Sequence, residues 1–444
     1  FIVTGVLIRG GLQQRPLDWG YAYFSKSNMA NSAAQNPIFF FGRSYIEMKE
    51  EEKFQNKFLK KYNLDQLSNS YEKLRLLHSG EKKKISINKL REKPPNVVLI
   101  VLESFVSENC NFLNPHLNQN ITPFLSELST KSISFSNCFA NGIRSAYGLG
   151  SILTSWPVIP GKPIISQVES GFPNNILNKS MDVFSKLGYR RTFLCGIDTN
   201  FDNMKGFCNA NGFDEIIDIN HKRLSNSQDG TMWGIYDHIM LDHLIEIANS
   251  HDESEPFMIT FFSTTNHDPF RIPNEYEKYF SNITIGNKKY QKAKKTMAYN
   301  DLILKEFFEK AKHESWYSNT IFIITADHGL TVHRDIPNHP RNGHIPLLFF
   351  SDLINEHLKI DKVVSQVDIM PTLIDLISED DYLNLFYGIS GLRKGPGFAC
   401  RVSNETLQWI TPNNLYYEIM GKNKSHKYVF NNIWDKEYIE VLNE

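Results

Sequence analysis

The chain has 444 residues, with 48 Lys and Arg against 49 Asp and Glu, so its formal net charge is −1 at pH 7. No overall field attracts nucleic acid or anionic lipid, and we expect no nucleic-acid partner. The 41% hydrophobic and 13% aromatic content is that of a globular protein with a large core. The five cysteines form no C-x-x-C pair, which argues against a disulfide scaffold and a structural zinc module.

The first 94 residues predict an arm followed by a charged helix and linker. Residues 1 to about 45 carry the turn signal Arg9-Gly10-Gly11 and aromatic residues without a sustained period, which is typical of an arm lying on another surface. From Met48 to about Ile87 charges dominate, which predicts a solvated helix and linker. No stretch approaches the ~20 apolar residues that span a bilayer. Because the sequence begins at Phe1 without a cleavage-site pattern, we expect a fragment or mature form whose true N-terminus was removed.

Residues 95–378 alternate apolar, β-branched runs with helix-like segments. The run Asn96–Leu102 is almost continuously apolar and suits a central parallel strand covered on both faces. Further strands are predicted at 132–135, 191–194, 257–262, 320–325 and 345–350, and helices at 122–131 (with Thr122 as N-cap), 147–153, 181–187, 236–248 and 290–312. The alternation predicts an α/β fold with a mainly parallel central sheet and helices on both faces. Residues 379–444 have shorter pieces, such as 415–418 and 427–430, and predict a small antiparallel appendage of the same domain.

Polar residues follow three of the predicted strands. Glu103 follows the first, Asn266-His267-Asp268 comes shortly after residues 257–262, and Asp327-His328 follows residues 320–325. In an open parallel sheet, functional groups collect at the carboxyl ends of the strands. Asp327 and His328 offer two ligands for a divalent cation, and Glu103 offers a third.

A fourth ligand candidate is Ser145, which stands directly before a short predicted helix. The helix N-terminus and Arg144 favour an anion above this hydroxyl. A bound cation would lower the pKa of the Ser145 hydroxyl and make it a nucleophile without a neighbouring His base. Taken singly, a strand-end Glu, an Asp-His pair and a Ser before a helix are common structural features; their joint placement indicates a site.

These motifs together resemble the sulfatase-like branch of the alkaline phosphatase superfamily, in particular the lipoteichoic acid synthase and phosphoglycerol transferase group. The resemblance runs from about Arg9 to the C-terminal appendage and rests on segments 9–17, 96–104, 141–145, 266–270, 327–329 and 367–372, in that order. It implies that one divalent cation is held by Glu103, Ser145, Asp327 and His328. In that group the cation is commonly Mn²⁺, and Mg²⁺ and Zn²⁺ are the alternatives.

The resemblance also implies roles for further residues. Ser145 stands where the group usually has a Thr nucleophile, and His267 stands where it has a substrate-contacting or proton-donating His. Asn266 and Asp268 belong to the same motif and are expected to bind substrate. His344 resembles a position near the phosphate in many relatives, although a His before a strand is commonly structural.

The function implied is metal-dependent transfer of a phosphoglycerol- or phosphoethanolamine-type head group. The donor would be a membrane phospholipid, the acceptor a glycan or lipid, and the intermediate phospho-Ser145, with Arg144 stabilising charge on the phosphoryl oxygens. The resemblance further implies transmembrane helices before Phe1 and a catalytic domain on the extracytoplasmic side of a bacterial cell membrane.

Two departures from the pattern keep alternatives open. Ser145 is followed by Ala146-Tyr147-Gly148 and not by the x-Pro-x-Arg of formylglycine sulfatases, which disfavours sulfate ester hydrolysis. Residues 194–204 offer no His, Trp or Arg where lipoteichoic acid synthases grip glycerol phosphate. The alternatives are a phosphodiesterase, a sulfate ester hydrolase, a phosphonate or aryl monoester hydrolase, and a non-catalytic head-group-binding domain. The phosphonate or aryl monoester hydrolase would need a second metal, for which His267, His344 and Asp268 are the candidates.

Overall fold

The structure is a computed structural model of the chain. It describes residues 19–35, 37–58, 69, 73, 94–161, 163–166, 179–226, 229–332, 339–378, 386–403, 406–419, 424–435 and 438–441. The predicted turn at Arg9-Gly10-Gly11 and almost all of the predicted linker up to Ile87 lie outside these residues.

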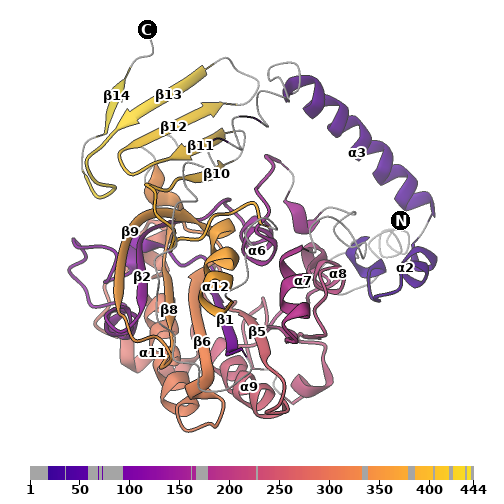
Figure 1. Cartoon of the computed structure of the whole chain (residues 1–444), viewed down its shortest axis with the longest axis horizontal. Coiled ribbons are helices and arrows are strands. Elements are labelled where there is room, and N and C mark those ends of the chain that lie inside the picture. The colour runs from indigo at the N-terminus through magenta and orange to yellow at the C-terminus, as the bar shows by residue number, and fades with distance from the viewer. Residues whose placement is uncertain are drawn as a thin grey trace.

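A nine-stranded sheet forms the centre of the protein (Figure 1). Its strands are β1 (Asn96–Leu102), β2 (Ile133–Phe139), β3 (Arg190–Cys195), β4 (Glu215–Ile217), β5 (Phe257–Phe262), β6 (Thr320–Ala326), β7 (His344–Ile345), β8 (Leu347–Phe350) and β9 (Leu358–Ser365). They lie in the order β4-β3-β5-β1-β6-β8-β2-β7, and β9 pairs with β2. The five strands from β4 to β6 are parallel, β8 is antiparallel to both of its neighbours, and β9 is parallel to β2.

The three middle strands, β5, β1 and β6, are buried along their whole length. Their sequences lack polar alternation because both faces of the sheet are covered there. The predicted strands 96–102 and 257–262 coincide with β1 and β5, and the prediction of an α/β fold with a mainly parallel sheet is confirmed.

Helices pack around this sheet (Figure 1). α11 packs against α9 and α5, whereas α6 packs against α7 and α12. The helices of this part are α5 (Pro123–Ser129), α6 (Ser145–Thr154), α7 (Lys179–Lys186), α8 (Met204–Ala210), α9 (Asp237–Asn249), α10 (Lys289–Lys292), α11 (Lys294–Ala311) and α12 (Ile369–Ile377). The single helix predicted at 290–312 is wrong in one respect. Ala293 lies between α10 and α11, and its ψ of −10° differs from the mean α-helical value although its backbone stays in the right-handed helical region.

Short 3₁₀ helices connect many of these elements. They are η2 (Ser107–Asn109), η3 (Ile164–Ser166), η6 (Phe201–Asn203), η7 (Lys222–Leu224), η8 (Asn274–Phe280), η9 (Tyr317–Asn319), η10 (Pro340–Gly343) and η11 (Gln366–Asp368). Two consecutive non-glycine residues of η6, Asp202 and Asn203, have left-handed backbones with φ of 52° and 59°. Such backbone conformations persist where the surrounding structure holds them in place, which marks η6 as a tightly fixed segment.

The N-terminus of α5 is capped from another helix. Thr122 is the N-cap residue, as predicted, but its side chain does not cap α5 and instead accepts the N–H of Asn111 at 2.8 Å. The carboxylate of Asp301, on α11, accepts the N–H groups of Phe124 and Leu125, each at 2.8 Å. Burial raises the pKa of Asp301 to about 7. The cap was invisible in the local sequence because its acceptor is remote along the chain.

A separate five-stranded antiparallel sheet follows the central sheet (Figure 1). Its strands are β10 (Ala399–Ser403), β11 (Thr406–Ile410), β12 (Asn414–Ile419), β13 (Lys424–Val429) and β14 (Ile439–Val441). Its apolar face forms a second hydrophobic cluster, which also contains Phe139 of β2 and Val363 of β9. The small sheet is therefore anchored on the central sheet, and the predicted antiparallel appendage is confirmed.

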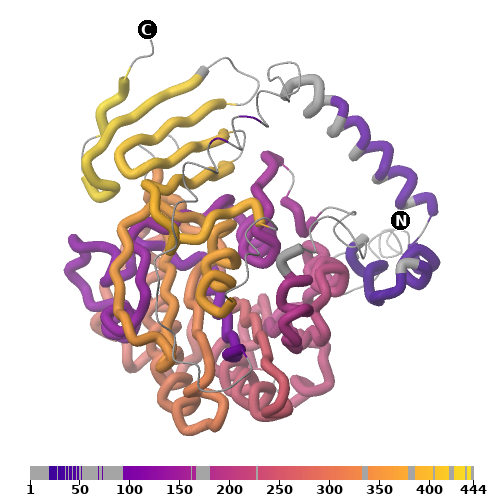
Figure 2. Tube along the Cα trace, viewed as in Figure 1, coloured from indigo at the N-terminus to yellow at the C-terminus, as the bar shows by residue number. Residues whose placement is uncertain are grey.

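The N-terminal arm has three described helices: η1 (Trp19–Ala22), α2 (Asn28–Ala34) and α3 (Pro37–Phe58). Figure 2 shows α2 and α3 along one side of the protein. η1 packs against η6 and α8, and the Tyr21 hydroxyl donates to Asp198 Oδ2 at 2.9 Å. Tyr23 is fully buried. Part of this segment therefore lies on another surface of the chain.

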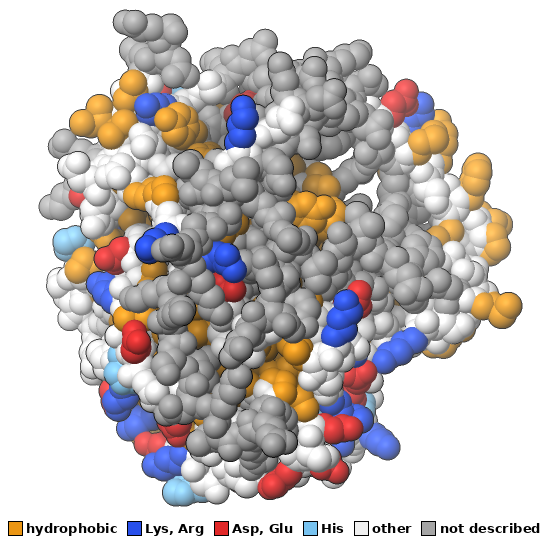
Figure 3. Space-filling model, viewed as in Figure 1, with side chains coloured by type: hydrophobic (Ala, Val, Ile, Leu, Met, Phe, Trp, Pro, Cys, Tyr) orange, Lys and Arg blue, Asp and Glu red, His pale blue; other side chains and the backbone are white. Residues whose placement is uncertain are grey.

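The arm also carries exposed apolar side chains. Hydrophobic side chains gather along the edge formed by α2 and α3 (Figure 3), and those exposed include Met29, Ile38, Phe41, Tyr45 and Met48. Among the described residues, none of the helices has the length and apolar character that crossing a membrane requires.

Candidate functional site

The candidate site lies at the carboxyl ends of β1 and β6, which are adjacent parallel strands. Glu103 follows β1 directly, and Asp327 and His328 follow β6. Because Leu102 pairs with Ala326 in the sheet, the side chains that come next are brought to the same edge. The sheet thus joins two segments that lie more than 200 positions apart along the chain.

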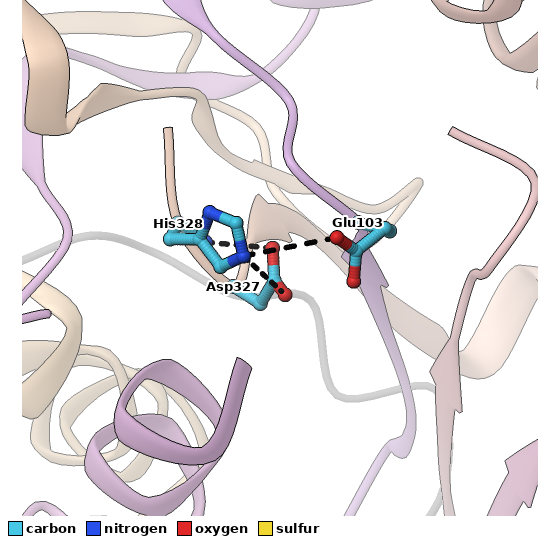
Figure 4. Close-up of side chains that lie close together, drawn as sticks. All are labelled: Glu103, Asp327 and His328. Carbon is cyan, nitrogen blue, oxygen red and sulfur yellow. Dashed lines mark hydrogen bonds and ion pairs between the residues drawn. The ribbon is translucent and has the colours of Figure 1, made fainter. Parts of the chain in front are cut away.

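These three side chains point toward one another (Figure 4). His328 Nε2 lies 3.7 Å from Glu103 Oε1 and 3.5 Å from Asp327 Oδ2. One potential ligand atom from each residue falls within 4.8 Å of the others. Two carboxylates and an imidazole at this spacing are a donor set that suits a divalent cation.

Backbone hydrogen bonds fix the two carboxylates. Asp327 Oδ1 accepts the N–H groups of Ser104 and His328, at 2.8 and 2.7 Å. The Ser104 hydroxyl donates to Glu103 Oε1 at 2.6 Å, and Ser104 has a left-handed backbone with φ of 51°. The second oxygen, Asp327 Oδ2, is buried and has no hydrogen-bond partner among the described residues. A buried, unpartnered carboxylate oxygen is costly unless a cation or proton neutralises it, so this atom fits a metal ligand.

The tautomer of His328 fits the same role. Its Nδ1 lies 2.8 Å from the carbonyl oxygen of Gly329. A carbonyl can only accept, so Nδ1 carries the proton and the neutral ring leaves Nε2 with a lone pair. That lone pair faces the oxygens of Glu103 and Asp327. A cation between these atoms would offset the repulsion of their lone pairs. An imidazole whose other nitrogen donates to a carbonyl is typical of metal-binding histidines.

The electrostatics of the cluster are consistent with this fit. Burial raises the pKa of Asp327 well above its usual range, and the carboxylate of Glu103 raises it further. Burial also acts to raise the pKa of Glu103, but the imidazoles of His328 and His267, together with side-chain hydrogen bonds, lower it, and the net pKa is lowered. Burial lowers the pKa of His328. The two carboxylates cannot both ionise cheaply here, and a divalent cation would remove that conflict.

Ser145 joins this cluster from a third element. It is the first residue of α6, and its hydroxyl donates to Glu103 Oε2 at 3.2 Å. α6 can approach β6 because Gly148 has no side chain: a Cβ there would lie only 1.8 Å from the carbonyl oxygen of Asp327. The sequence placed Ser145 beside Glu103, Asp327 and His328, and the structure brings these four residues together.

Arg144 is the N-cap residue of α6, and its side chain turns toward η6. Its Nη2 lies 3.1 Å from Asp202 Oδ2, while about half of the Arg144 side chain stays exposed. The guanidinium is therefore held at the edge of the site by a carboxylate on another segment. It remains accessible to an anion placed over Ser145.

A cavity of about 240 Å³ opens over the cluster. Glu103, Ser145 and His328 of the cluster line it. Other predicted site residues and further aromatic and charged side chains complete the lining. The lining residues are Glu103, Ser104, Ile143, Arg144, Ser145, Ile197, Phe201, Asp202, Met204, Trp233, Phe262, Thr264, His267, Asp268, Lys289 and His328. The cavity thus combines the Ser145 hydroxyl, cationic side chains and an apolar side.

The three residues of the motif 266–268 lie in two different places. His267 and Asp268 line the cavity, as predicted for substrate contacts. Asn266 is fully buried: its Nδ2 donates to the carbonyl oxygen of Glu103 at 2.9 Å, and its Oδ1 accepts the hydroxyl of Thr296. The structure therefore places Asn266 behind Glu103, where it fixes the backbone of the site and does not line the cavity.

His344 lies elsewhere. It is fully buried, its Nε2 lies 2.7 Å from the carbonyl oxygen of Ser136, and its ring packs between Phe139 and Trp434. Burial lowers its pKa to about 4. The structure does not bring His344 to the cavity that contains Ser145.

Lys289 and Trp233 are among the cavity residues that sequence reasoning missed. Lys289 begins α10, and Trp233 lies in a tight turn before α9. Neither follows a predicted strand, and neither stands in a recognisable motif. The only signal was the isolated tryptophan in Thr231-Met232-Trp233-Gly234, which carried no information about its neighbours in space.

The comparisons with known proteins agree with this geometry. The sulfatase family model matches residues 95–379. A lipoteichoic acid synthase-like protein, YvgJ of Bacillus subtilis, is 25% identical over 240 residues, which cover 52% of this chain and 36% of that protein. Phosphoglycerol transferase I of Salmonella typhi is 22% identical over 284 residues, which cover 60% of this chain and 35% of that protein. The chain thus matches about a third of the length of these curated relatives.

Solved structures show the same fold. An alkaline phosphatase superfamily protein from Vibrio parahaemolyticus has a TM-score of 0.69 at 25% identity, covering 82% of this chain and 85% of that one. The lipoteichoic acid synthase LtaP from Listeria monocytogenes has a TM-score of 0.66 at 18% identity, covering 82% and 91%. The resemblance stated from the sequence motifs is confirmed. The chain belongs to the sulfatase family, within the alkaline phosphatase superfamily.

Proposed function

We propose that this protein transfers a phospho-head-group, of phosphoglycerol or phosphoethanolamine type, from a membrane phospholipid to a glycan or lipid acceptor. The observation that carries this proposal is the hydroxyl of Ser145, which is hydrogen-bonded to Glu103 within the Glu103, Asp327 and His328 cluster and faces the cavity. The names of the curated relatives, a lipoteichoic acid synthase-like protein and a phosphoglycerol transferase, support the same reaction class.

In the first step Ser145 Oγ attacks phosphorus. The Oγ–P bond forms while the P–O bond to diacylglycerol breaks, and the Ser145 proton ends on the diacylglycerol oxygen. Arg144 and Lys289 supply positive charge at the cavity wall for the phosphoryl oxygens. The N-terminal N–H groups of α6 add to that field because Ser145 begins the helix.

In the second step the acceptor hydroxyl attacks the phospho-Ser145 intermediate. The new O–P bond forms as the bond to Oγ breaks, and the acceptor proton passes through His267 to the Ser145 oxygen. His267 lines the cavity and is the imidazole there that does not belong to the metal-ligand set. If water takes the place of the acceptor, the same steps make the enzyme a phosphodiesterase.

Glu103, Asp327 and His328, with Ser145, would hold one divalent cation, and we propose Mn²⁺. When bound, the cation supplies positive charge that lowers the pKa of a hydroxyl and offsets charge on phosphoryl oxygens. Within the described part of the chain, these three carboxylate and imidazole residues are the one group that could hold a metal. His344, a candidate ligand for a second metal, is buried and does not line the cavity. Both observations favour the one-metal transferase over the two-metal hydrolase.

Because the proposed donor is a membrane phospholipid, the reaction would take place at a membrane surface. We propose that the catalytic domain works on the extracytoplasmic face of a bacterial cell membrane, with the membrane as partner through transmembrane helices. The exposed apolar side chains of α2 and α3 are consistent with an arm near a lipid surface.

A labelled donor tests the proposal. Protein with Mn²⁺ is incubated with phospholipid vesicles whose head-group phosphate carries ³²P, and the protein is analysed for label on Ser145. We expect label on the wild type and on Ser145→Thr, which keeps a hydroxyl, and none on Ser145→Ala. Product formed under single-turnover conditions without labelled protein would show direct transfer and refute the intermediate. Product that contains only the free head-group phosphate, with acceptor present, would identify a phosphodiesterase.

A further inference from the structure

Trp233 contacts the His267 imidazole and the backbone next to it. The centroids of the two rings are 3.9 Å apart. The indole Nε1–H donates to the carbonyl oxygen of Asp268 at 2.8 Å, and His267 Nδ1 lies 3.0 Å from the same oxygen. The carbonyl oxygen of Asp268 is therefore within hydrogen-bond distance of both rings. The indole also covers one side of the imidazole.

The turn that carries Trp233 is itself fixed to the central sheet. Gly230 and Ile235 form an antiparallel bridge, and the Ile235 N–H donates to the carbonyl oxygen of Gly196 at 3.0 Å. Gly234 packs so closely that a Cβ would lie 2.2 Å from that carbonyl oxygen. Gly196 directly follows β3, so the position of Trp233 is set by the same sheet edge that carries the catalytic cluster. An indole held this way is a rigid support.

The shared carbonyl determines which nitrogen of His267 carries the proton. A carbonyl oxygen only accepts hydrogen bonds, so of the two neutral tautomers of His267 the contact selects the one with the proton on Nδ1 and the lone pair on Nε2. A base needs that lone pair in a fixed direction, because proton transfer depends on hydrogen-bond geometry before it depends on pKa. Trp233 controls both features: its N–H holds the Asp268 carbonyl, and its ring limits rotation of the imidazole.

We propose that Trp233 is a positioning residue that holds His267 as the Nδ1–H tautomer with Nε2 directed to the acceptor hydroxyl. This inference rests on the proposed function for its kinetic part and on the contacts alone for its structural part. In the step concerned, Nε2 takes the acceptor proton, the acceptor oxygen bonds to phosphorus, the P–O bond to Ser145 breaks, and the proton passes to Oγ. Trp233 makes no bond in this step.

The structural part is tested without any substrate. Nitrogen-15 spectra of imidazole-labelled protein report which ring nitrogen carries the proton, and His267 is assigned by the signal lost in His267→Ala. The wild type should show a protonated Nδ1 and an unprotonated Nε2. Trp233→Ala should show averaging between the two tautomers. An unchanged Nδ1–H tautomer in Trp233→Ala would overturn the proposal.

The kinetic part uses bis(p-nitrophenyl) phosphate with Mn²⁺, because p-nitrophenolate leaves without a proton. In Trp233→Ala the burst that reports formation of phospho-Ser145 should stay within about twofold, while steady-state turnover falls about 10- to 100-fold. Trp233→Phe keeps an aromatic ring and should lose less. The double variant Trp233→Ala/His267→Ala should lose no more than His267→Ala. Losses that multiply would show that Trp233 acts independently of His267 and would contradict the proposal.

Trp156 provides the matched control. It is another partly exposed tryptophan, and its ring packs edge-on against Tyr387 at 4.7 Å, away from the cavity. Trp156→Phe and Trp156→Ala should leave the His267 tautomer and the ratio of burst to steady-state rate unchanged; a tautomer change in either would mean that loss of any tryptophan disturbs the site. A wild type without a burst would refute the phospho-Ser145 step, while the tautomer measurement would still decide the role of Trp233.

Discussion

Replacing Gly148 by alanine tests whether the packing of α6 on β6 places the nucleophile. The new Cβ would lie 1.8 Å from the carbonyl oxygen of Asp327, and ordinary van der Waals contact begins at 3.4 Å. The neighbour is backbone at the end of a buried strand, so it cannot rotate away. α6 must therefore move by about 1.6 Å, if the strand stays in place, to accommodate one methyl group.

The displacement acts directly on Ser145, one turn earlier on the same helix. Its hydrogen bond to Glu103, 3.2 Å in the structure, would lengthen well outside hydrogen-bond range. A misplacement of about 1 Å at a reacting group costs about 100-fold in rate. We therefore expect Gly148→Ala to lower kcat about 100-fold and to destabilise the fold by about 1–3 kcal/mol from overpacking. Glu103 and His328 lie outside α6, so we expect Mn²⁺ affinity to fall by less than the rate.

Gly150→Ala is the control on the same helix. Its Cβ would lie 2.4 Å from Ile164 Cγ2, the end of a side chain that can change rotamer. Both variants are assayed for turnover of bis(p-nitrophenyl) phosphate, for Mn²⁺ binding by calorimetry and for urea unfolding. We expect Gly150→Ala to keep most of its activity. Wild-type kcat in folded Gly148→Ala would refute the reasoning, because Ser145 would then be placed by something other than this contact.

Three further predictions concern the metal ligands, the cavity wall and a buried imidazole. Asp327→Asn should lower Mn²⁺ affinity, measured by calorimetry, by at least about 100-fold. Asp202→Asn is the control: it loses only the ion pair with Arg144 and should bind Mn²⁺ with wild-type affinity. Lys289→Ala should lower kcat/KM for a phosphodiester about tenfold or more by removing one charge-assisted contact to the phosphoryl oxygens, with partial recovery in Lys289→Arg. His344 is neutral in the fold because burial lowers its pKa from 6.5 to about 4, so its contribution to stability is present above pH 6.5 and is lost as the pH falls toward 4. Urea unfolding at both ends of that range should show His344→Gln, which keeps a donor to Ser136, to be about 3 kcal/mol less acid-sensitive than the wild type.

The sequence located the clustered side chains of the candidate site well where they come directly after a buried parallel strand. Glu103 and Asp327 could be predicted because apolar β-branched runs mark β1 and β6, and adjacent parallel strands bring the residues after them to one edge of the sheet. Ser145 was found for a related reason, since a hydroxyl at a helix start is a local feature. In each case the information lay within a few residues of the side chain itself.

Contacts between remote segments could not be predicted in that way. The tight turn that brings Trp233 to His267 depends on Gly196 at the end of another strand, and the cap on α5 depends on Asp301. Asn266 stands inside a recognised motif, yet its amide is directed at the backbone behind Glu103. The sequence shows the residue type at such positions, but only the tertiary arrangement determines which partner the side chain reaches.

The stretch from Trp19 to Tyr23 lies ahead of the segment that the sulfatase model matches, yet it backs one wall of the cavity. Gly20 approaches the carbonyl oxygen of Asn200 so closely that a Cβ would lie 2.8 Å from it, and Tyr23 fits against Gly206. Phe201 and Asp202 of the cavity lining stand between these two contacts. A shortened protein that begins at residue 95 would contain every proposed ligand and the proposed nucleophile, but it would leave the rear of that wall open to water. The boundary of the family match therefore separates the candidate site from the segment that packs behind its wall.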